Sequence, residues 1–440
     1  MFARRFVMIW SALWMCSCLT GWLPAAVDDA AIDNAASEYQ RIFNAAREAG
    51  ERPNQADMGD YVDRVLAGIP LDQLTLDQID TVLQKLPASM STKTAPALDA
   101  LLAGKAAATD ADGARAACLR LRLLPAMAKS GDRLSRLKAA LAHPGINEAI
   151  ARGYGTELLS SAAALAAADL QSIQPDLLNL ADSVNSGSPP AFFVGGAGLF
   201  MSAAQSLGPQ AVKAMSPLRE KLAAALEQKL QSQGSQLDKP TKDRLDRSLA
   251  QLKGAWARGE LIGFAAPKLD FIWFHDPLNP DRKITSLDDL KGKVVILDFW
   301  ATWCGPCIAS FPKVKAVSRY YRGFEVVVIG VTSIQGFHSG SGGRIDTSGD
   351  PQKEMSLMPE FMKEKEMAWP VAFSSQPVFN PDYGVTGIPN MVIIDANGVV
   401  RYAGLHPGSS LEEKIRLIDP LLAEAKLPLP AIMMEMKKPQ

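Results

Sequence analysis

Hydrophobic residues follow one pattern up to about residue 258 and a different one after about residue 261. In the first part, apolar residues recur every three or four positions between Pro and Gly residues at helix-length intervals, which is the pattern of amphipathic helices. One stripe, Leu76, Ile79, Leu83 and Leu86, follows a Thr75-x-x-Gln78 capping box. We find no fixed repeat period, so residues 27–258 predict an all-helical domain whose role the pattern does not reveal.

The second part contains short apolar runs of strand length. Residues 294–300 are almost continuously apolar and are interrupted only by Asp298, which indicates a central strand covered on both faces. Phe311, Val314 and Val317 then recur at helical spacing, and further strands are expected at 324–331, before 395 and at 399–403, the last two joined by an Asn397-Gly398 turn. We therefore predict an α/β domain at 261–426, with a mixed central sheet flanked by helices, and a C-terminal tail at 427–440.

Two stretches interrupt these patterns. Residues 333–352 are rich in Gly and Ser and are longer than the usual connection, so we expect a flexible insertion. It could be a tolerated surface loop, or it could be a lid or docking loop. His338 within it could approach the cysteines of the second part, Cys304 and Cys307. The run at 191–201 is apolar and glycine-rich but lacks the spacing of a phosphate-binding loop. It is expected to form a buried helix, with glycines that permit close packing, or a bent loop.

The N-terminus has the organisation of an export signal. Arg4 and Arg5 precede an apolar stretch from 6 to 23, so residues 1–26 predict a signal peptide or, since the stretch is almost long enough to span a bilayer, a membrane anchor. A small-x-small cleavage site is poorly formed near Ala25. Cys18 matches a lipid-attachment box only weakly, and the apolar residues after it argue against lipidation.

Charge and cysteine content narrow the possible functions. The 46 basic and 47 acidic residues give a net charge of −1, so no nucleic-acid partner is expected. Outside residues 1–26 the chain has Cys118, Cys304 and Cys307, too few for a fold held together by disulfides. Cys118 lies on an apolar helix face, where a buried inert thiol is more common than a third redox participant.

Cys304 and Cys307 form a C-x-x-C pair at the predicted start of a helix. Unpaired amides and the helix dipole at such a position stabilise a thiolate at Cys304, and a spacing of three brings both sulfurs to one side. A zinc site would need two further ligands, and Cys118 and the four scattered histidines do not supply them at ligand spacing. We expect redox chemistry and no metal. Asp298 on the buried strand should have its pKa raised toward neutrality by burial.

The segment from Phe299 to Cys307, with Pro312 after it, resembles the active-site segment of the thioredoxin superfamily. Residues 267–293 are similar to the entry of the extracytoplasmic TlpA/ResA-like branch, and the resemblance covers about the last two fifths of the chain. It implies a thioredoxin-like fold, a redox-active Cys304–Cys307 disulfide without any other cofactor, and a cis bond before Pro389. It also implies a set of substrate-binding residues: Trp303, Gly305, Pro306, Ile388 and Pro389.

One position departs from the resembled branch. Ser310 stands where a glutamate is usual, so the resemblance assigns the proton-transfer role to Asp298, six residues before Cys304. A serine cannot relay a proton at a carboxylate's pKa.

The expected function is that of an exported thiol-disulfide oxidoreductase, with Cys304, Cys307 and Asp298 catalytic. The Gly305-Pro306 dipeptide resembles that of reductants, so we expect reduction of disulfides in partner proteins, in the periplasm or cell envelope, and recharging by a membrane-embedded thiol donor. Two alternatives stay open at this point. The domain could be a disulfide oxidant or isomerase, or the helical part could be a partner-binding module with an accessory redox domain.

Overall fold

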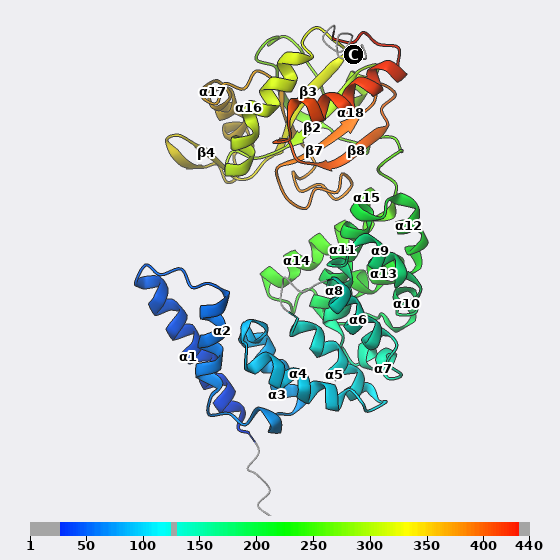
Figure 1. Cartoon of the computed structure of the whole chain (residues 1–440). Coiled ribbons are helices and arrows are strands. Elements are labelled where there is room, and N and C mark those ends of the chain that lie inside the picture. The colour runs from blue at the N-terminus through cyan, green and yellow to red at the C-terminus, as the bar shows by residue number, and fades with distance from the viewer. Residues whose placement is uncertain (1–26, 125–129, 431–440) are drawn as a thin grey trace, which may run out of the picture. The chain divides into compact units, whose positions relative to one another are not determined.

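A computed structural model describes residues 27–124 and 130–430 (Figure 1). The predicted signal peptide or anchor at 1–26 lies outside these residues, as does most of the tail at 427–440. Within the described ranges, no helix is both long enough and apolar enough to cross a membrane. Internal contacts divide the chain after Ala149 into two compact units, and each is considered by itself below.

The described residues up to 258 form helices joined by short turns, as predicted. In the described residues, Asp110 caps α5 through its side chain and Asp238 caps α14 in the same way, which is how the sequence fixes several of the helix starts. The α-helices are α1 Asp29–Glu48, α2 Gln55–Leu66, α3 Leu76–Lys85, α4 Thr94–Lys105, α5 Ala111–Arg122, α6 Ser130–Leu141, α7 Ile146–Ala151, α8 Thr156–Ala163, α9 Ala167–Ser172, α10 Gln174–Leu178, α11 Pro190–Ser206, α12 Pro209–Ala214, α13 Ser216–Gln233, α14 Lys239–Lys253 and α15 Ala255–Arg258. Short 3-10 helices occur at η1 Leu71–Gln73, η2 Ala88–Met90 and η3 Ala181–Ser183.

Helices α3 and α11 show how two of the predicted sequence patterns determine helix capping and packing. Thr75 and Gln78 form the predicted capping box of α3, and Ile79 and Leu86 of its stripe are buried in the core of the first unit, with Leu76 and Leu83 packed against that core. The glycine-rich run is the buried helix α11. A Cβ at Gly196 would lie 2.8 Å from Leu222 Cδ1, so glycine permits the close packing of α11 on α13.

The described residues after 261 form an α/β domain, as predicted. Its six-stranded mixed sheet has the order β1-β6-β3-β2-β7-β8. Strand β2 pairs in parallel with β3 and antiparallel with β7, and all six of its residues are buried, which confirms a central strand covered on both faces. The elements are β1 Phe271–His275, η4 Leu287–Leu290, β2 Val294–Phe299, α16 Gly305–Tyr320, β3 Val326–Ser333, β4 Phe337–Gly340, β5 Gly343–Asp346, α17 Pro351–Glu364, β6 Val371–Ser374, β7 Asn390–Ile394, β8 Val400–Leu405 and α18 Leu411–Glu424.

Strand direction brings the predicted site together at one edge of the sheet. Strands β2, β3 and β6 are parallel, so their carboxyl ends share that edge. Phe299, the last residue of β2, pairs with Asn390, the first residue of β7. The segment after β2 that carries the cysteines therefore lies at the same edge as Ile388 and Pro389, which precede β7.

The insertion at 333–352 contains regular structure that the sequence analysis did not predict, while its flexibility stays a prediction. Strands β4 and β5 form a two-stranded antiparallel hairpin, and α17 begins at Pro351. The hairpin is held by the buried carboxylate of Glu354, which accepts hydrogen bonds from the amides of Gln335 and Gly336 and from the hydroxyl of Thr347. The turn of the hairpin is rich in Gly and Ser. This composition is typical of loops, so the sequence analysis predicted no strands there.

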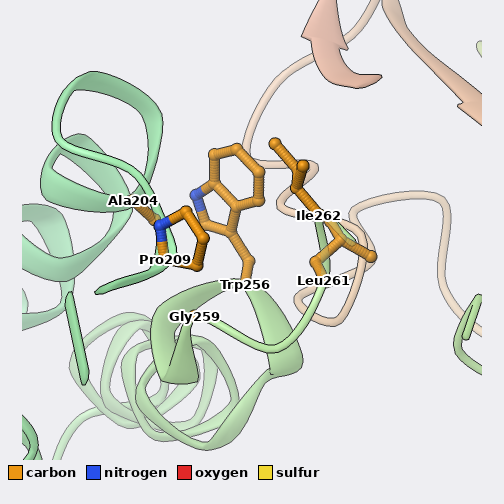
Figure 2. A pocket seen from close by; sticks show the side chains of 6 residues that line it. All are labelled: Ala204, Pro209, Trp256, Gly259, Leu261 and Ile262. Atoms are coloured by element: carbon orange, nitrogen blue, oxygen red, sulfur yellow. The ribbon is translucent and has the colours of Figure 1, made fainter. Parts of the chain in front are cut away.

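The segment between the helices and the sheet is packed, although the sequence suggests a short linker there. The Ala255 amide donates to Asp382 Oδ1, and a Cβ at Gly384 would lie 2.7 Å from the Trp256 ring. Figure 2 shows Trp256 beside Pro209, with Leu261 and Ile262 on its other side, around a small pocket. The contacts accordingly place the helices after Ile150 in one unit with the sheet. Whether 261–426 folds alone, as the predicted boundary implies, stays a prediction.

Candidate active site

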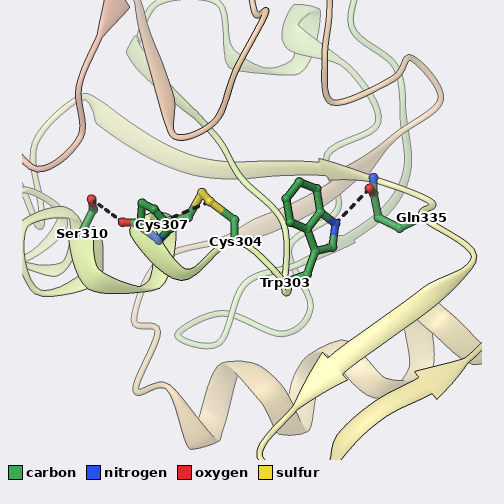
Figure 3. Close-up of a disulfide and its surroundings, with 6 residues drawn as sticks. Trp303, Cys304, Cys307, Ser310 and Gln335 are labelled. Carbon is green, nitrogen blue, oxygen red and sulfur yellow. Dashed lines mark hydrogen bonds between the residues drawn. A yellow bond between two sulfur atoms is a disulfide. The ribbon is translucent and has the colours of Figure 1, made fainter. Parts of the chain in front are cut away.

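The two cysteines are joined in a disulfide at the start of α16 (Figure 3). Cys304 is the N-cap residue of this helix, and its Sγ accepts a hydrogen bond from the Cys307 amide at 3.2 Å. Pro306 lies within the first turn, where its missing N–H costs no helical hydrogen bond. A reduced Cys304 at this position would carry its negative charge against an amide and the positive end of the helix.

Both cysteines are largely inaccessible to solvent. Cys304 is only 3% exposed although it stands at the start of the helix, and Cys307 is buried as well. Both belong to the main hydrophobic core of the domain, against which Ile388 packs. Gly305 and Pro306 between them are exposed. Little of either cysteine is therefore directly open to a reacting molecule.

Asp298 is buried on β2, with 2% of its surface exposed. Side chains alternate along a strand, so Asp298 points to the same face as Val294 and Ile296, the face that packs with Cys307 in the core. Its Oδ1 has no hydrogen-bond partner among the described residues. Burial raises the pKa of Asp298 to about 7, and the charge of Lys414 opposes this rise. A group that titrates near neutrality on this face could exchange protons there.

Lys414 is a site residue that the sequence analysis missed. It lies on α18, is 1% exposed, and its Nζ donates to the carbonyls of Pro407 and Ser409 at 2.7 and 2.6 Å. Burial lowers its pKa to about 8, while the charge of Asp298 acts in the opposite direction. Both groups therefore titrate close to physiological pH, and each charge affects the other.

Trp303 stands directly before Cys304 and is 41% exposed. Its indole Nε1 donates to Gln335 Oε1 at 3.2 Å (Figure 3). The backbone amide of Gln335 in turn donates to the buried carboxylate of Glu354. The hairpin insertion thus fixes the exposed ring beside the disulfide. The sequence analysis singled out neither Gln335 nor Glu354, because polar side chains are common in loops and on exposed helix faces.

The remaining predicted residues have defined places. The peptide bond between Ile388 and Pro389 is cis, as the resemblance implies, and both residues are half-buried. Ser310 is buried and donates from its hydroxyl to the Pro306 carbonyl at 3.0 Å, so it completes the first turn of α16 rather than facing a substrate.

Two further residues can be placed outside the redox pair. His338 on β4 is buried, its ring packs edge-on against Phe361, and burial lowers its pKa. Cys118 is buried on α5, as predicted. In residues 27–124 and 130–430 no group of three or more His, Cys, Asp or Glu side chains is arranged to hold a metal ion.

The second part of the chain is similar to known proteins. Residues 265–415 match the Redoxin family model. The thioredoxin-like protein YneN of Bacillus subtilis is 28% identical over 136 residues, which are 30% of this chain and 69% of that protein. The thiol-disulfide oxidoreductase ResA of Bacillus thuringiensis is 28% identical over 144 residues, or 32% of this chain and 72% of that protein. A solved thioredoxin-like superfamily protein covers 36% of this chain and 96% of its own length, with 21% identity and a TM-score of 0.29.

The site joins three chemical elements. A dithiol or disulfide stands at a helix N-terminus, a buried carboxylate titrates near neutrality on the strand face packed with it, and an exposed aromatic ring precedes the first cysteine. Such a site can exchange two electrons and two protons with another disulfide or dithiol.

Proposed function

We propose, on the premise that residues 265–415 are a thioredoxin-like thiol-disulfide oxidoreductase domain of the TlpA/ResA-like kind, that this domain reduces disulfides of partner proteins. The observation that supports this most directly is the helix-capping position of Cys304, whose Sγ faces the Cys307 amide. That position favours the thiolate form, which is the attacking species in disulfide exchange.

The proposed reaction has two exchange steps. The Cys304 thiolate attacks one sulfur of the substrate disulfide, a mixed disulfide forms, and the other substrate sulfur leaves as a thiolate. Cys307 then loses its proton to the Asp298 carboxylate and attacks Cys304 Sγ, which breaks the mixed disulfide and releases the second substrate thiolate. Two electrons pass to the substrate, two protons complete its thiols, and Cys304–Cys307 ends as the disulfide found in the structure.

Substrate contact is proposed at the residues around the two sulfurs. Trp303, Gly305 and Pro306 are exposed there, and Ile388 and Pro389 precede β7 at the same sheet edge. No further cofactor is part of this proposal. Each turnover leaves the enzyme oxidised, so a dithiol donor must restore it, and we propose a membrane-embedded one.

We place the protein outside the cytoplasm, in the periplasm or cell envelope. The support for this is the basic and apolar organisation of residues 1–26, and either a cleaved signal or a retained anchor fits it.

The first prediction tests the roles of the two cysteines. With Cys307→Ser in the native host, mixed disulfides should accumulate on Cys304, because the step that resolves them is lost. With Cys304→Ser they should not. Non-reducing gels followed by identification of the trapped proteins provide the measurement, and the reverse trapping pattern would exchange the two assignments.

The alternative direction of electron flow has a separate test. An oxidant or isomerase on the same fold would have a reduction potential well above about −200 mV, whereas thioredoxin-type reductants lie near −270 mV. Equilibration of the Cys304–Cys307 pair with glutathione or dithiothreitol buffers gives this value. A reduction potential above about −200 mV for this pair would contradict the proposed reductase function.

A further inference from the structure

A groove of about 740 Å³ runs between α14 and the segment that follows β6. On one side its lining includes Arg247, Ala250 and Gln251 of α14. On the other side it includes Pro377, Phe379 and Thr386. Most of the exposed surface area of the lining is apolar. The lining residues that are exposed to solvent include Arg247, Ala250, Pro377, Phe379 and Thr386.

An aromatic pair connects the groove to the disulfide. Phe379 is 40% exposed, and its ring centroid lies 6.4 Å from that of Trp303, the residue before Cys304. Thr386 lies at the other end of the same segment, two residues before Ile388, which packs against the core that contains both cysteines. A chain that occupied the groove would thus reach the sulfurs over exposed aromatic surface, and aromatic residues are favoured as anchors in protein interfaces.

One arginine in the groove lacks an ion-pair partner among the described residues. Asp246 is paired with Lys242 at 2.7 Å, whereas Arg247 makes no ion pair with any residue of the described chain. Asp382 accepts a hydrogen bond from the Ala255 amide and keeps its own negative charge at the other wall. The guanidinium of Arg247 is therefore the group in the groove that is free to pair with a carboxylate on a ligand.

The walls of the groove are fixed in place. Asn380 Oδ1 accepts from the Asp382 amide and its carbonyl accepts from Val385, which closes the segment into a compact turn. A Cβ at Gly254 would lie 2.5 Å from the Pro381 carbonyl, so the end of α14 is seated directly on this turn. Preformed walls reduce the cost of ordering a site upon binding.

From these observations we propose that the groove docks an extended, apolar segment of the substrate protein that flanks its disulfide and carries an acidic residue opposite Arg247. This inference rests on the proposed reductase function and adds the substrate class: polypeptide disulfides with an acidic neighbour. It also gives the helical part a role, since α14 supplies one wall of the docking site.

Synthetic peptides with one internal disulfide test the charge requirement on the full chain. In one set, each peptide has a single Glu at a different position of the apolar segment that follows the disulfide. In a matched set, Lys replaces Glu at the same positions. With the unmodified protein, kcat/KM for reduction should be higher for Glu than for Lys at the position facing Arg247, by about two- to five-fold, the span of exposed ion pairs. Arg247→Glu should reverse that preference. Arg244→Glu, the same change on an exposed part of α14 outside the groove lining, should leave it unaltered.

A second variant tests the groove without relying on charge. Ala250→Trp would fill it, so the rate of insulin reduction divided by that of oxidised glutathione should fall by about five-fold or more, as expected for loss of an interface anchor. Oxidised glutathione is too small to need the groove and reports on the disulfide chemistry itself.

The outcomes separate the two proposals. If neither insulin nor glutathione is reduced by the unmodified protein, the reductase function fails. If both are reduced but Arg247→Glu and Ala250→Trp match the unmodified protein and Arg244→Glu, the docking proposal is overturned while the function stands. A dimer in sedimentation analysis that Ala250→Trp dissociates would assign the groove to a second copy of the chain and would also overturn it.

Discussion

The protonation of Asp298 couples catalysis to stability at the level of a single residue. Its folded pKa of about 7 lies above the ordinary aspartate value, so ionisation opposes folding. Below about pH 4 the carboxyl group is protonated in both the folded and the unfolded protein, so ionisation does not affect the free energy of unfolding. The destabilisation by ionisation grows as the pH rises toward 7 and then levels off. Asp298→Asn removes this destabilisation and should stabilise the oxidised protein by about 4 kcal/mol at pH 8 and by about 1 to 2 kcal/mol at pH 5. Urea unfolding at both pH values measures this difference.

The same substitution should slow the reaction. Without a base near neutrality for Cys307, reduction of insulin should fall by about 10²- to 10⁴-fold, the usual contribution of general acid-base catalysis. Asp276→Asn serves as a control, because this carboxylate is also buried but lies outside the active site. An unchanged rate in Asp298→Asn would leave Asp298 with a structural role only.

Lys414 should set the pH at which Asp298 acts. Its positive charge lowers the pKa of Asp298, so Lys414→Met should raise that pKa and move the acidic limb of the pH-rate profile to higher pH. Below the pKa, each tenfold gain in proton affinity lowers the ionised fraction about tenfold. The exposed neighbour Arg416 provides the control as Arg416→Met. Equal profiles for the two variants would contradict the coupling.

Sequence reasoning identified some of these residues and not others for a physical reason. Cys304 and Cys307 were found because they share one helix turn, and Asp298 because an acid interrupts a buried strand. Lys414 and Glu354 act through contacts between distant parts of the chain. Each stands among charged helix residues, so nothing nearby in the sequence marks it as buried.

At the scale of elements, the hairpin insertion depends on one carboxylate. Glu354 is buried and joins Gln335, Gly336 and Thr347, so its loss leaves two amides and a hydroxyl without an acceptor. Glu354→Ala should destabilise the domain by about 1 to 3 kcal/mol and increase hydrogen exchange across residues 335–347. Glu360→Ala on the exposed side of α17 is the matched control. Equal exchange in both variants would mean that other contacts hold the hairpin.

Periodicity predicted the helical part of the chain and four strands of the six-stranded sheet, but β1, β6 and the two hairpin strands were not predicted. The apolar runs located β2, β3, β7 and β8 to within a few residues, since burial dictates apolar letters. Strands β4 and β5 were missed because β5 is exposed along its whole length and carries no apolar alternation. In the helical part, α14 ends at Lys253, where the backbone of Gly254 becomes extended and packs against Pro381.

At the scale of the whole molecule, the boundary near residue 260 can be tested by fragments. A fragment 261–430 should fold and reduce insulin, because the sheet and all three of its helices lie within it. A fragment 255–430 retains Trp256, whose ring packs over Gly384, and should be more stable by about 1 to 3 kcal/mol, the gain from burying one large side chain. Thermal unfolding compares the two, with Trp256→Ala in the longer fragment as control. An insoluble short fragment would show that the helices complete the domain.

The common edge of β2, β3 and β6 has a consequence for how the domain can be altered. The segments that follow these strands carry the cysteines, the hairpin and the Phe379 turn, whereas the paired strands beneath them hold the register. Residues 337–346 and 376–387 could therefore be exchanged as cassettes, in the way that antibody loops are grafted, to retarget the proposed reductase toward new polypeptides, with Gln335, Gly336 and Thr347 kept as the partners of Glu354. The electron-transfer chemistry would be inherited unchanged from the framework.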